Sequence, residues 1–209
     1  MTISDTFDLL DWKRRIFDLY ARVRAQDDPA RAWELWRTTR DEMFKTHPQS
    51  PIPEGRRPSF AGIELFAYDP AFRVIGTVRD ATEEHYAIPT SDDGTMRFTR
   101  IGICEFALDG EPSELELYWL DAYAGGLFLP FRDALSGKET YGAGRYLLDT
   151  VKGADLGTSG DKMVLDFNFA YNPSCAHDPR WVCPLAPPPN RLRQAIRAGE
   201  KVPADPVDH

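Results

Sequence analysis

Residues 95–120, TMRFTRIGICEFALDGEPSELELYWL, decide the fold, because polar and apolar side chains alternate along them on both sides of one interruption. Alternation with a period of two residues is typical of a β-strand with one face in the core. The interruption, Asp109-Gly110-Glu111-Pro112, has the composition of a turn. The stretch therefore predicts two antiparallel strands, near 95–108 and 114–120.

One face of the first strand is mostly apolar. Its residues of one parity are Met96, Phe98, Gly102, Cys104, Phe106 and Leu108. We expect this face to lie in the core, where Cys104 is a small buried residue rather than a reactive thiol. Arg100 has the same parity, which requires either a bulge in the strand or an inward arginine beside a partner.

The same alternation, cut by turn signals, continues through residues 60–170. The predicted strands lie near 73–79, 95–108, 114–120, 126–131, 139–148 and 162–169. Successive strands joined by turns favour an antiparallel sheet. We expect this sheet to close into a β-barrel or to fold into a β-sandwich.

Two helices precede the strands, because apolar residues recur at helical spacing over 5–25 and 29–45. We expect them to form a hairpin over residues 5–47 that packs Trp33 and Trp36 against the rest of the protein. The fold class is therefore α+β.

Closely spaced prolines follow the strands and predict a stiff segment at 171–198 that closes the fold. Beyond it, the charged and proline-containing residues 199–209 are expected to fray. Nothing in the composition divides the chain, so we expect residues 1–209 to form a single domain.

Composition narrows the class of protein. Against 33 acidic residues stand 25 basic ones, and the formal net charge of −8 argues against a nucleic-acid partner. No apolar run reaches the roughly 18 residues of a membrane helix, so no membrane partner is expected. The N-terminus lacks a signal-peptide pattern and three cysteines form no disulfide framework, so we expect a cytoplasmic protein.

Three chemical interpretations compete for Cys175, His177 and Cys183 in the proline-rich stretch. A zinc site is poorly supported, because C-x-H and H-x5-C spacings match no paired knuckle. A Cys175 nucleophile would need a base, and His177 lies only two residues away. The third interpretation makes the cysteines packing anchors of a stiff loop. We expect no metal and no cofactor.

A second group of polar residues suggests a ligand site. Arg145 follows two glycines in YGAGRYL (141–147), a motif that lacks the features of a phosphate loop. Its guanidinium is suited to fork onto a carboxylate of a ligand or of Asp166. Asp166 and Asn168 share one face of a predicted strand, and Tyr171-Asn172 follows it.

The runs YWLDAYAGGLFLPFRDALSGKETYGAGRYLLD (118–149) and DFNFAYNPSCAHDPRWVCPLAPPPNRL (166–192), followed by IRAGE, carry a family resemblance. With them the chain resembles, over nearly its whole length, the bacterial domain-of-unknown-function family numbered 1684. The resemblance implies no reaction, substrate or cofactor. The chain departs from the family pattern at Ala143 and Pro189, where the family has glycine and glutamate, and at His177, where relatives often have tyrosine.

Three hypotheses about function follow. The first is binding of a small anionic or polar molecule in a cavity of the barrel or sandwich, with Arg145, Asp166, Asn168, Tyr171 and Asn172 as candidate ligand-binding residues. Cys175, His177, Cys183 and Arg100 are secondary candidates. The second is a hydrolase or transferase that uses Cys175 or Asp166. The third is a homodimeric scaffold that associates through the Trp33/Trp36 helix face or an open sheet edge.

Overall fold

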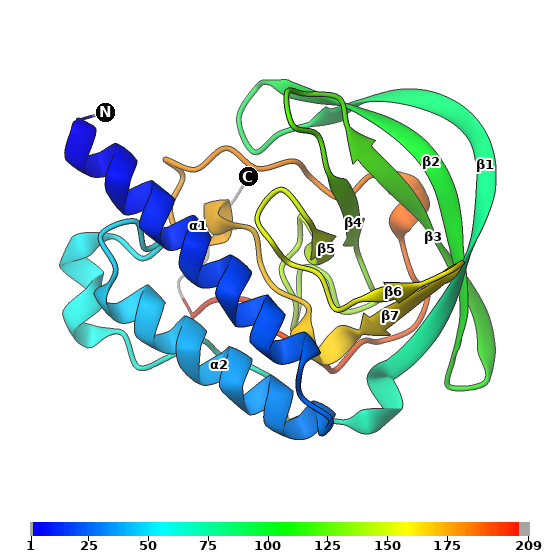
Figure 1. The fold of residues 1–209 in the computed structure, drawn as a ribbon, viewed down its shortest axis with the longest axis horizontal. Coiled ribbons are helices and arrows are strands. Elements are labelled where there is room, and N and C mark those ends of the chain that lie inside the picture. The colour runs from blue at the N-terminus through cyan, green and yellow to red at the C-terminus, as the bar shows by residue number, and fades with distance from the viewer. Residues whose placement is uncertain (1, 205–209) are drawn as a thin grey trace.

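The structure, a computed structural model, describes residues 2–204. A hairpin of two helices, α1 (Ile3–Arg24) and α2 (Pro29–Thr46), lies against a curved antiparallel sheet (Figure 1). The two predicted helices are confirmed. Thr2 caps α1 in a capping box with Asp5, and the side chain of Asp28 accepts hydrogen bonds from the first turn of α2.

The tryptophans of α2 pack the hairpin onto the rest of the protein. Trp36 is fully buried and donates a hydrogen bond from Nε1 to the Tyr20 hydroxyl at 3.0 Å. Trp33 is half-buried and donates to the backbone oxygen of Asn168 at 3.0 Å. Both indole N–H groups are therefore used within the chain.

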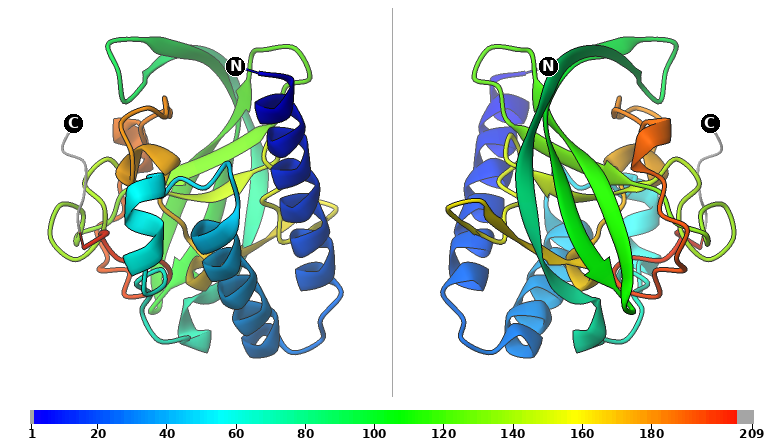
Figure 2. Two further views of the ribbon diagram at one scale, coloured as in Figure 1. Left: turned by 90° about the vertical axis from the view of Figure 1, so that its left-hand side faces the viewer. Right: turned by 90° about the vertical axis from the view of Figure 1, so that its right-hand side faces the viewer.

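Within the part of the chain that the structure describes, seven strands form one sheet, in the order β5-β4-β3-β2-β1-β7-β6. Their bounds are β1 Arg73–Pro89, β2 Thr95–Leu108, β3 Glu111–Leu120, β4 Leu127–Phe131, β5 Arg145–Asp149, β6 Thr158–Ser159 and β7 Lys162–Asp166. All neighbouring pairs are antiparallel. The long strands β1 to β3 bend strongly around the body of the protein (Figure 2).

The prediction of a closed barrel or a two-sheet sandwich is wrong. The described strands belong to a single open sheet, whose edges β5 and β6 are not paired with each other. The α+β class and the antiparallel sheet are right. Alternation reports which residues face the core but not which strands become neighbours, so it does not distinguish an open sheet from a closed one.

A bulge explains the parity of Arg100. On β2, Arg100 pairs with Tyr118 but Gly102 pairs with Leu117, so two positions on β2 match one on β3. Cys104, beyond the bulge, is fully buried. Of the two alternatives for Arg100, the bulge is the one that the register shows.

Strand β7 ends earlier than predicted. Residues 167–169 form the 3-10 turn η3 (Phe167–Phe169), because the Asp166 side chain accepts the backbone N–H of Asn168 and caps the turn. Asp166 and Asn168 are therefore both buried, and their side chains do not share the outer face of a strand. The predicted strand 139–148 likewise begins only at Arg145.

The C-terminal segment is irregular but well tied to the body. It contains the 3-10 turns η4 (Ser174–Ala176) and η5 (Pro188–Asn190); two further turns, η1 (Glu54–Ser59) and η2 (Pro70–Phe72), lie before the sheet. The backbone N–H groups of Glu200, Lys201 and Val202 donate to Ala170, Glu64 and Glu139. These hydrogen bonds tie residues 200–202, part of the tail that was predicted to fray, to the body of the protein, and residues 205–209 lie outside the described residues.

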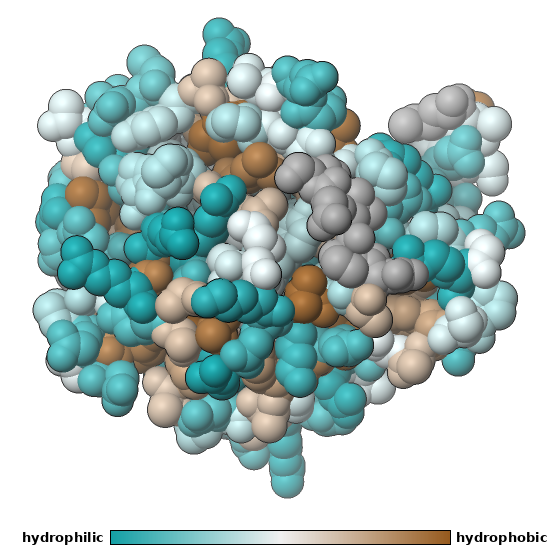
Figure 3. Space-filling view, turned by 180° about the vertical axis from the view of Figure 1, so that it is seen from behind, coloured by the Kyte–Doolittle hydropathy of each residue, from teal (hydrophilic) through white to brown (hydrophobic). Residues whose placement is uncertain are grey.

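The helices and the surface of the protein were compared with the features of membrane spans and of protein–protein interfaces. Of the helices within residues 2–204, none combines the length and hydropathy of a transmembrane span. On the face seen from behind in Figure 3, hydrophobic side chains are scattered among hydrophilic ones. That face therefore carries no broad apolar patch of the kind that marks an obligate interface.

Candidate functional site

A cavity of about 310 Å³ lies between η1, the chain that follows η1, and the C-terminal segment. We call it the Asn172 cavity. The residues that matter to its chemistry are Arg56, Phe60, Glu64, Asn172, His177 and Lys201. Two smaller cavities border other predicted residues: one of about 70 Å³ beside Asp166 and one of about 50 Å³ beside Tyr171.

Two buried polar atoms on the wall of the Asn172 cavity have no hydrogen-bond partner among the described residues. The Asn172 side chain donates from Nδ2 to the Lys201 carbonyl at 2.7 Å. Its Oδ1, however, has no hydrogen-bond partner among residues 2–204, and neither has Nε2 of His177. Leaving a buried polar atom unpaired costs about 1–3 kcal/mol, so such atoms are uncommon unless something else binds them.

The charge around the cavity favours an anion. Burial, followed by the nearby charges of Arg40 and Arg56, lowers the pKa of His177 to about 4, so the imidazole is neutral at pH 7. Arg56 and Lys201 add positive charge at the wall, against the carboxylate of Glu64. A neutral imidazole between cations can donate a hydrogen bond to an anion.

A buried ion pair supports the wall from behind. Arg40 of α2 pairs with Oε1 of Glu200, and Oε2 of Glu200 accepts the backbone N–H of Asn172 at 2.8 Å. The Arg40 guanidinium also lies 5.1 Å from the ring centroid of Tyr171. The Tyr171 hydroxyl is buried without a partner among the described residues, and burial raises its pKa well above the ordinary value.

Arg145 pairs with a carboxylate, but with that of Asp133 and not that of Asp166, and through a single contact. Its Nη2 lies 2.8 Å from Asp133 Oδ2, and both side chains are buried. The same guanidinium donates to the carbonyls of Ile196, Ala198 and Glu200. Arg145 lines none of the three cavities; it holds the segment that carries Lys201 to the Asn172 cavity.

Asp166 and Asn168 do not line the Asn172 cavity. The Asn168 amide binds both the backbone N–H and the carbonyl of Asp69, at 2.9 and 2.8 Å, and also donates to Asp166 Oδ1. Oδ2 of Asp166 lies 3.6 Å from Nε of Arg73. Burial raises the pKa of Asp166 to about 6, although the hydrogen bonds from Asn168 oppose the rise.

The predicted gathering of Arg145, Asp166, Asn168 and Asn172 around one cavity is therefore wrong. Of the residues that the sequence suggested, Asn172 and His177 border the Asn172 cavity, and Tyr171 borders the smallest one. Sequence reasoning missed Arg56 and Lys201. Neither belongs to a motif, and they meet only through the fold.

The two cysteines of the proline-rich segment lie together in the interior. Cys175 and Cys183 are buried and hydrogen-bonded to each other. The pKa of Cys183 is lowered by that bond, by the charge of Lys152 and by the backbone N–H groups of Cys175 and Ser174. The pKa of Cys175 is raised by its bond to Cys183 and by burial. The more acidic thiol is thus Cys183, not Cys175.

His177 does not join the thiols. Its ring packs edge-on against Phe44, with the centroids 5.5 Å apart, and borders the Asn172 cavity. Within the described part of the chain, no three His, Cys, Asp or Glu side chains are grouped so that they could hold a metal ion.

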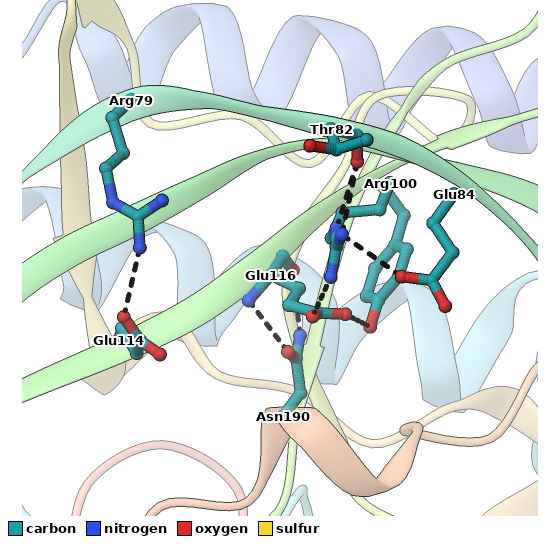
Figure 4. Close-up of polar contacts among 8 residues, drawn as sticks. Arg79, Thr82, Glu84, Arg100, Glu114, Glu116 and Asn190 are labelled. Atoms are coloured by element: carbon teal, nitrogen blue, oxygen red, sulfur yellow. Dashed lines mark hydrogen bonds and ion pairs between the residues drawn. The ribbon is translucent and has the colours of Figure 1, made fainter.

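Arg100 is engaged in a polar cluster on the sheet (Figure 4). Its guanidinium lies 2.7 Å from Glu116 and 3.0 Å from Glu84, and it donates to the carbonyl of Thr82. The Tyr118 hydroxyl donates to the other oxygen of Glu116 at 2.6 Å. Two carboxylates therefore balance the arginine within the protein.

These features define an α+β protein with an open antiparallel sheet and, beside it, a cavity whose wall carries two polar atoms without a hydrogen-bond partner in residues 2–204. The chain belongs to the family described as "Protein of unknown function (DUF1684)", whose model matches residues 58–201.

Among the solved structures that are similar to this chain, we describe one that matches most of it. It is the solution NMR structure of an uncharacterized protein from Haloarcula marismortui, which is 38% identical, with a TM-score of 0.59. The match covers 84% of this chain and 97% of that one. No curated protein matches the chain.

Proposed function

We propose that this protein binds a small anionic molecule that also carries a hydrogen-bond donor, and that it does so in the Asn172 cavity. One observation carries the proposal: Asn172 Oδ1 and His177 Nε2 are both buried and unpartnered within residues 2–204, and both residues line a cavity that Arg56 and Lys201 also border.

The residues on the wall suit different parts of such a ligand. Arg56 and Lys201 favour a carboxylate or phosphate, and neutral His177 can donate a further hydrogen bond to it. Asn172 Oδ1 can only accept, so it calls for a hydroxyl or amine on the ligand. Phe60 offers apolar contact.

The size of the cavity limits the ligand. A volume of about 310 Å³ is at the lower end of the roughly 300–1,000 Å³ range of small-molecule sites. A short hydroxy or amino acid, or a small phosphate ester, is therefore the class of ligand that we expect.

Titration of the ¹⁵N-labelled protein with malate, succinate and inorganic phosphate tests the proposal. Malate and succinate differ by one hydroxyl group, so we expect malate to bind about two- to tenfold more tightly, as one additional hydrogen bond would give. The amide signals of Asn172, His177 and Lys201 should shift. Equal affinities for malate and succinate, shifts confined to other residues, or no binding of any of the three anions would contradict the proposal.

A comparison of two lysine variants tests whether Lys201 supplies the positive charge that binds the anion. Lys201→Gln should weaken malate binding about tenfold, since it removes a charged hydrogen bond. Lys162→Gln is the matched control, because Lys162 is an exposed lysine on β7 that lines none of the three cavities. Equal weakening by both variants would indicate a general charge effect and not a site.

The alternative of a hydrolase or transferase has less support. Cys175 is buried with a raised pKa, and a thiol must ionise to act as a nucleophile. Asp166 borders the 70 Å³ cavity and not the Asn172 cavity. Neither side chain lines the Asn172 cavity, where Asn172 Oδ1 and His177 Nε2 lie.

A further inference from the structure

A second cavity, of about 70 Å³, lies where the C-terminal end of α1 and the start of α2 meet β7. Figure 1 shows this end of the helical hairpin beside β7. We call it the Asp166 cavity. Its polar lining residues are Arg24, Gln26, Arg73 and Asp166, and the others are apolar. It shares no described lining residue with the Asn172 cavity.

Asp166 contributes a hydrogen-bond acceptor that the described chain does not use. Its side chain is 2% exposed, and Oδ1 accepts hydrogen bonds from the backbone N–H and the side chain of Asn168, at 3.0 and 2.8 Å. Oδ2 has no hydrogen-bond partner among residues 2–204. Because an unpaired buried acceptor is costly, this oxygen calls for a ligand group that donates a hydrogen bond.

Arg73 contributes donors beside that acceptor. Its Nε lies 3.6 Å from Asp166 Oδ2, which is too far for a hydrogen bond, and no hydrogen bond joins its guanidinium to another described residue. The side chains of Arg73 and Arg24 are each 36% exposed. The two arginines therefore lie toward the mouth of the cavity, and the buried carboxylate lies at its base.

The charges of the lining favour an anion over a cation. Two guanidinium groups line the cavity against one carboxylate, although Asp155 pairs with Arg24 from outside the lining. An ammonium ion would donate to Asp166 but would be repelled by the arginines, whereas arginines bind oxyanions well. The ligand that satisfies both observations is anionic and still donates a hydrogen bond.

The volume limits the ligand to a small ion. One water molecule needs roughly 10–15 Å³, so about 70 Å³ has room for several waters or for one inorganic oxyanion. Sites for larger organic ligands begin near roughly 300 Å³.

We propose that the Asp166 cavity binds a small inorganic oxyanion that keeps a hydroxyl group, such as hydrogen phosphate or bicarbonate. The hydroxyl donates to Asp166 Oδ2, while Arg73 and Arg24 bind the charged oxygens. An oxyanion without a hydroxyl would place an oxygen lone pair against the carboxylate, so the site rejects sulfate and nitrate. It also rejects a phosphate monoester, whose doubly ionised phosphate has no hydroxyl.

The selection depends on an ionised Asp166. Burial raises the pKa of this carboxyl to about 6, so it is ionised at pH 8 and can only accept hydrogen bonds. The anions are therefore compared at pH 8.

Matched pairs of anions test the proposal. Hydrogen phosphate and sulfate share their charge and tetrahedral shape, and bicarbonate and nitrate share their charge and planar shape, but only the first of each pair has a hydroxyl. We expect hydrogen phosphate, bicarbonate or both to bind about tenfold more tightly than the matched ion, as a charged hydrogen bond would give. In the ¹⁵N-labelled protein, the Nε–H signal of Arg73 and the amide signal of Asn168 should report this binding, separately from signals of the Asn172 cavity.

Asp166→Asn reverses the role of the side chain. Its amide oxygen can still accept from Asn168 while its NH₂ group donates into the cavity, so the preference for the hydroxyl-bearing ion should disappear. Asp161→Asn is the matched control, because Asp161 is exposed and lies outside the cavity lining; it should keep the preference. Circular dichroism verifies that both variants fold.

Several outcomes would overturn the proposal. They are equal affinities within both pairs of ions, no binding of any of the four ions at millimolar concentration, and shifts that leave Arg73 and Asn168 unaffected. Methyl phosphate binding as tightly as hydrogen phosphate, or a preference that persists in Asp166→Asn, would do the same.

Discussion

Arg40 and Glu200 are 160 positions apart in the sequence, yet they form an ion pair in which both side chains are buried. The pair joins α2 to the C-terminal segment. Because the second carboxylate oxygen of Glu200 holds the backbone N–H of Asn172, it also fixes one wall of the Asn172 cavity.

Breaking this pair should destabilise the protein strongly. We expect Glu200→Gln to lower the free energy of unfolding by about 3–5 kcal/mol, because it leaves the Arg40 charge buried without compensation. The measurement is urea unfolding. The control, Arg37→Gln, breaks the exposed pair of Arg37 with Glu34 on the same helix and should cost no more than about 1 kcal/mol. Similar losses in the two variants would show that burial is not what matters.

His177 should make stability fall in acid. Its pKa is about 4 in the folded protein, mainly through burial, against about 6.5 when unfolded. The contribution of neutral His177 is complete above pH 6.5 and is lost as pH falls through 4, by up to about 3 kcal/mol. We expect the stability difference between wild type and His177→Gln to decrease over that window. The comparison variant is His85→Gln, which removes an exposed imidazole; the same decrease in both would argue against burial as the cause.

Asp166 should have the opposite dependence. Burial raises its folded pKa to about 6, so the folded state binds the proton more tightly and stability falls as pH rises from about 4 to about 6. Asp166→Asn removes the ionisable group. We expect the variant to gain relative to the wild type over this range, by up to about 3 kcal/mol at pH 7. Thermal unfolding at matched pH values measures the gain, and the exposed Asp161→Asn serves as control; a gain that does not depend on pH would contradict the assignment.

Cys183 should ionise before the other thiols. Its pKa is lowered by the hydrogen bond from Cys175 and by Lys152, whereas burial raises that of Cys104 to about 11. Thiolate absorbance at 240 nm should therefore show a step below the ordinary cysteine value of about 8.5. The step should disappear in Cys183→Ser and persist in Cys104→Ser. Its persistence in Cys183→Ser would assign it to another group.

The candidate site could be predicted from the sequence only in part. Asn172 and His177 stood out because polar residues and prolines cluster around them, and both border the cavity. Arg56 and Lys201 carried no signal, because their importance depends on meeting Asn172 in space. Arg145 was correctly expected to pair with a carboxylate, but the partner is Asp133 and not the one that its sequence context suggested.

The sequence by itself determined the local structure. Capping residues and helical spacing set the two helices, and alternation around the 109–112 turn set β2 and β3, because these patterns depend on backbone geometry within a few residues. Only the tertiary structure decided that the sheet stays open, that Asp166 caps a turn, and that Glu200 links Arg40 to Asn172. Those features depend on which distant segments come into contact, and hydrophobic periodicity shows which side of a segment is buried without showing what it is buried against.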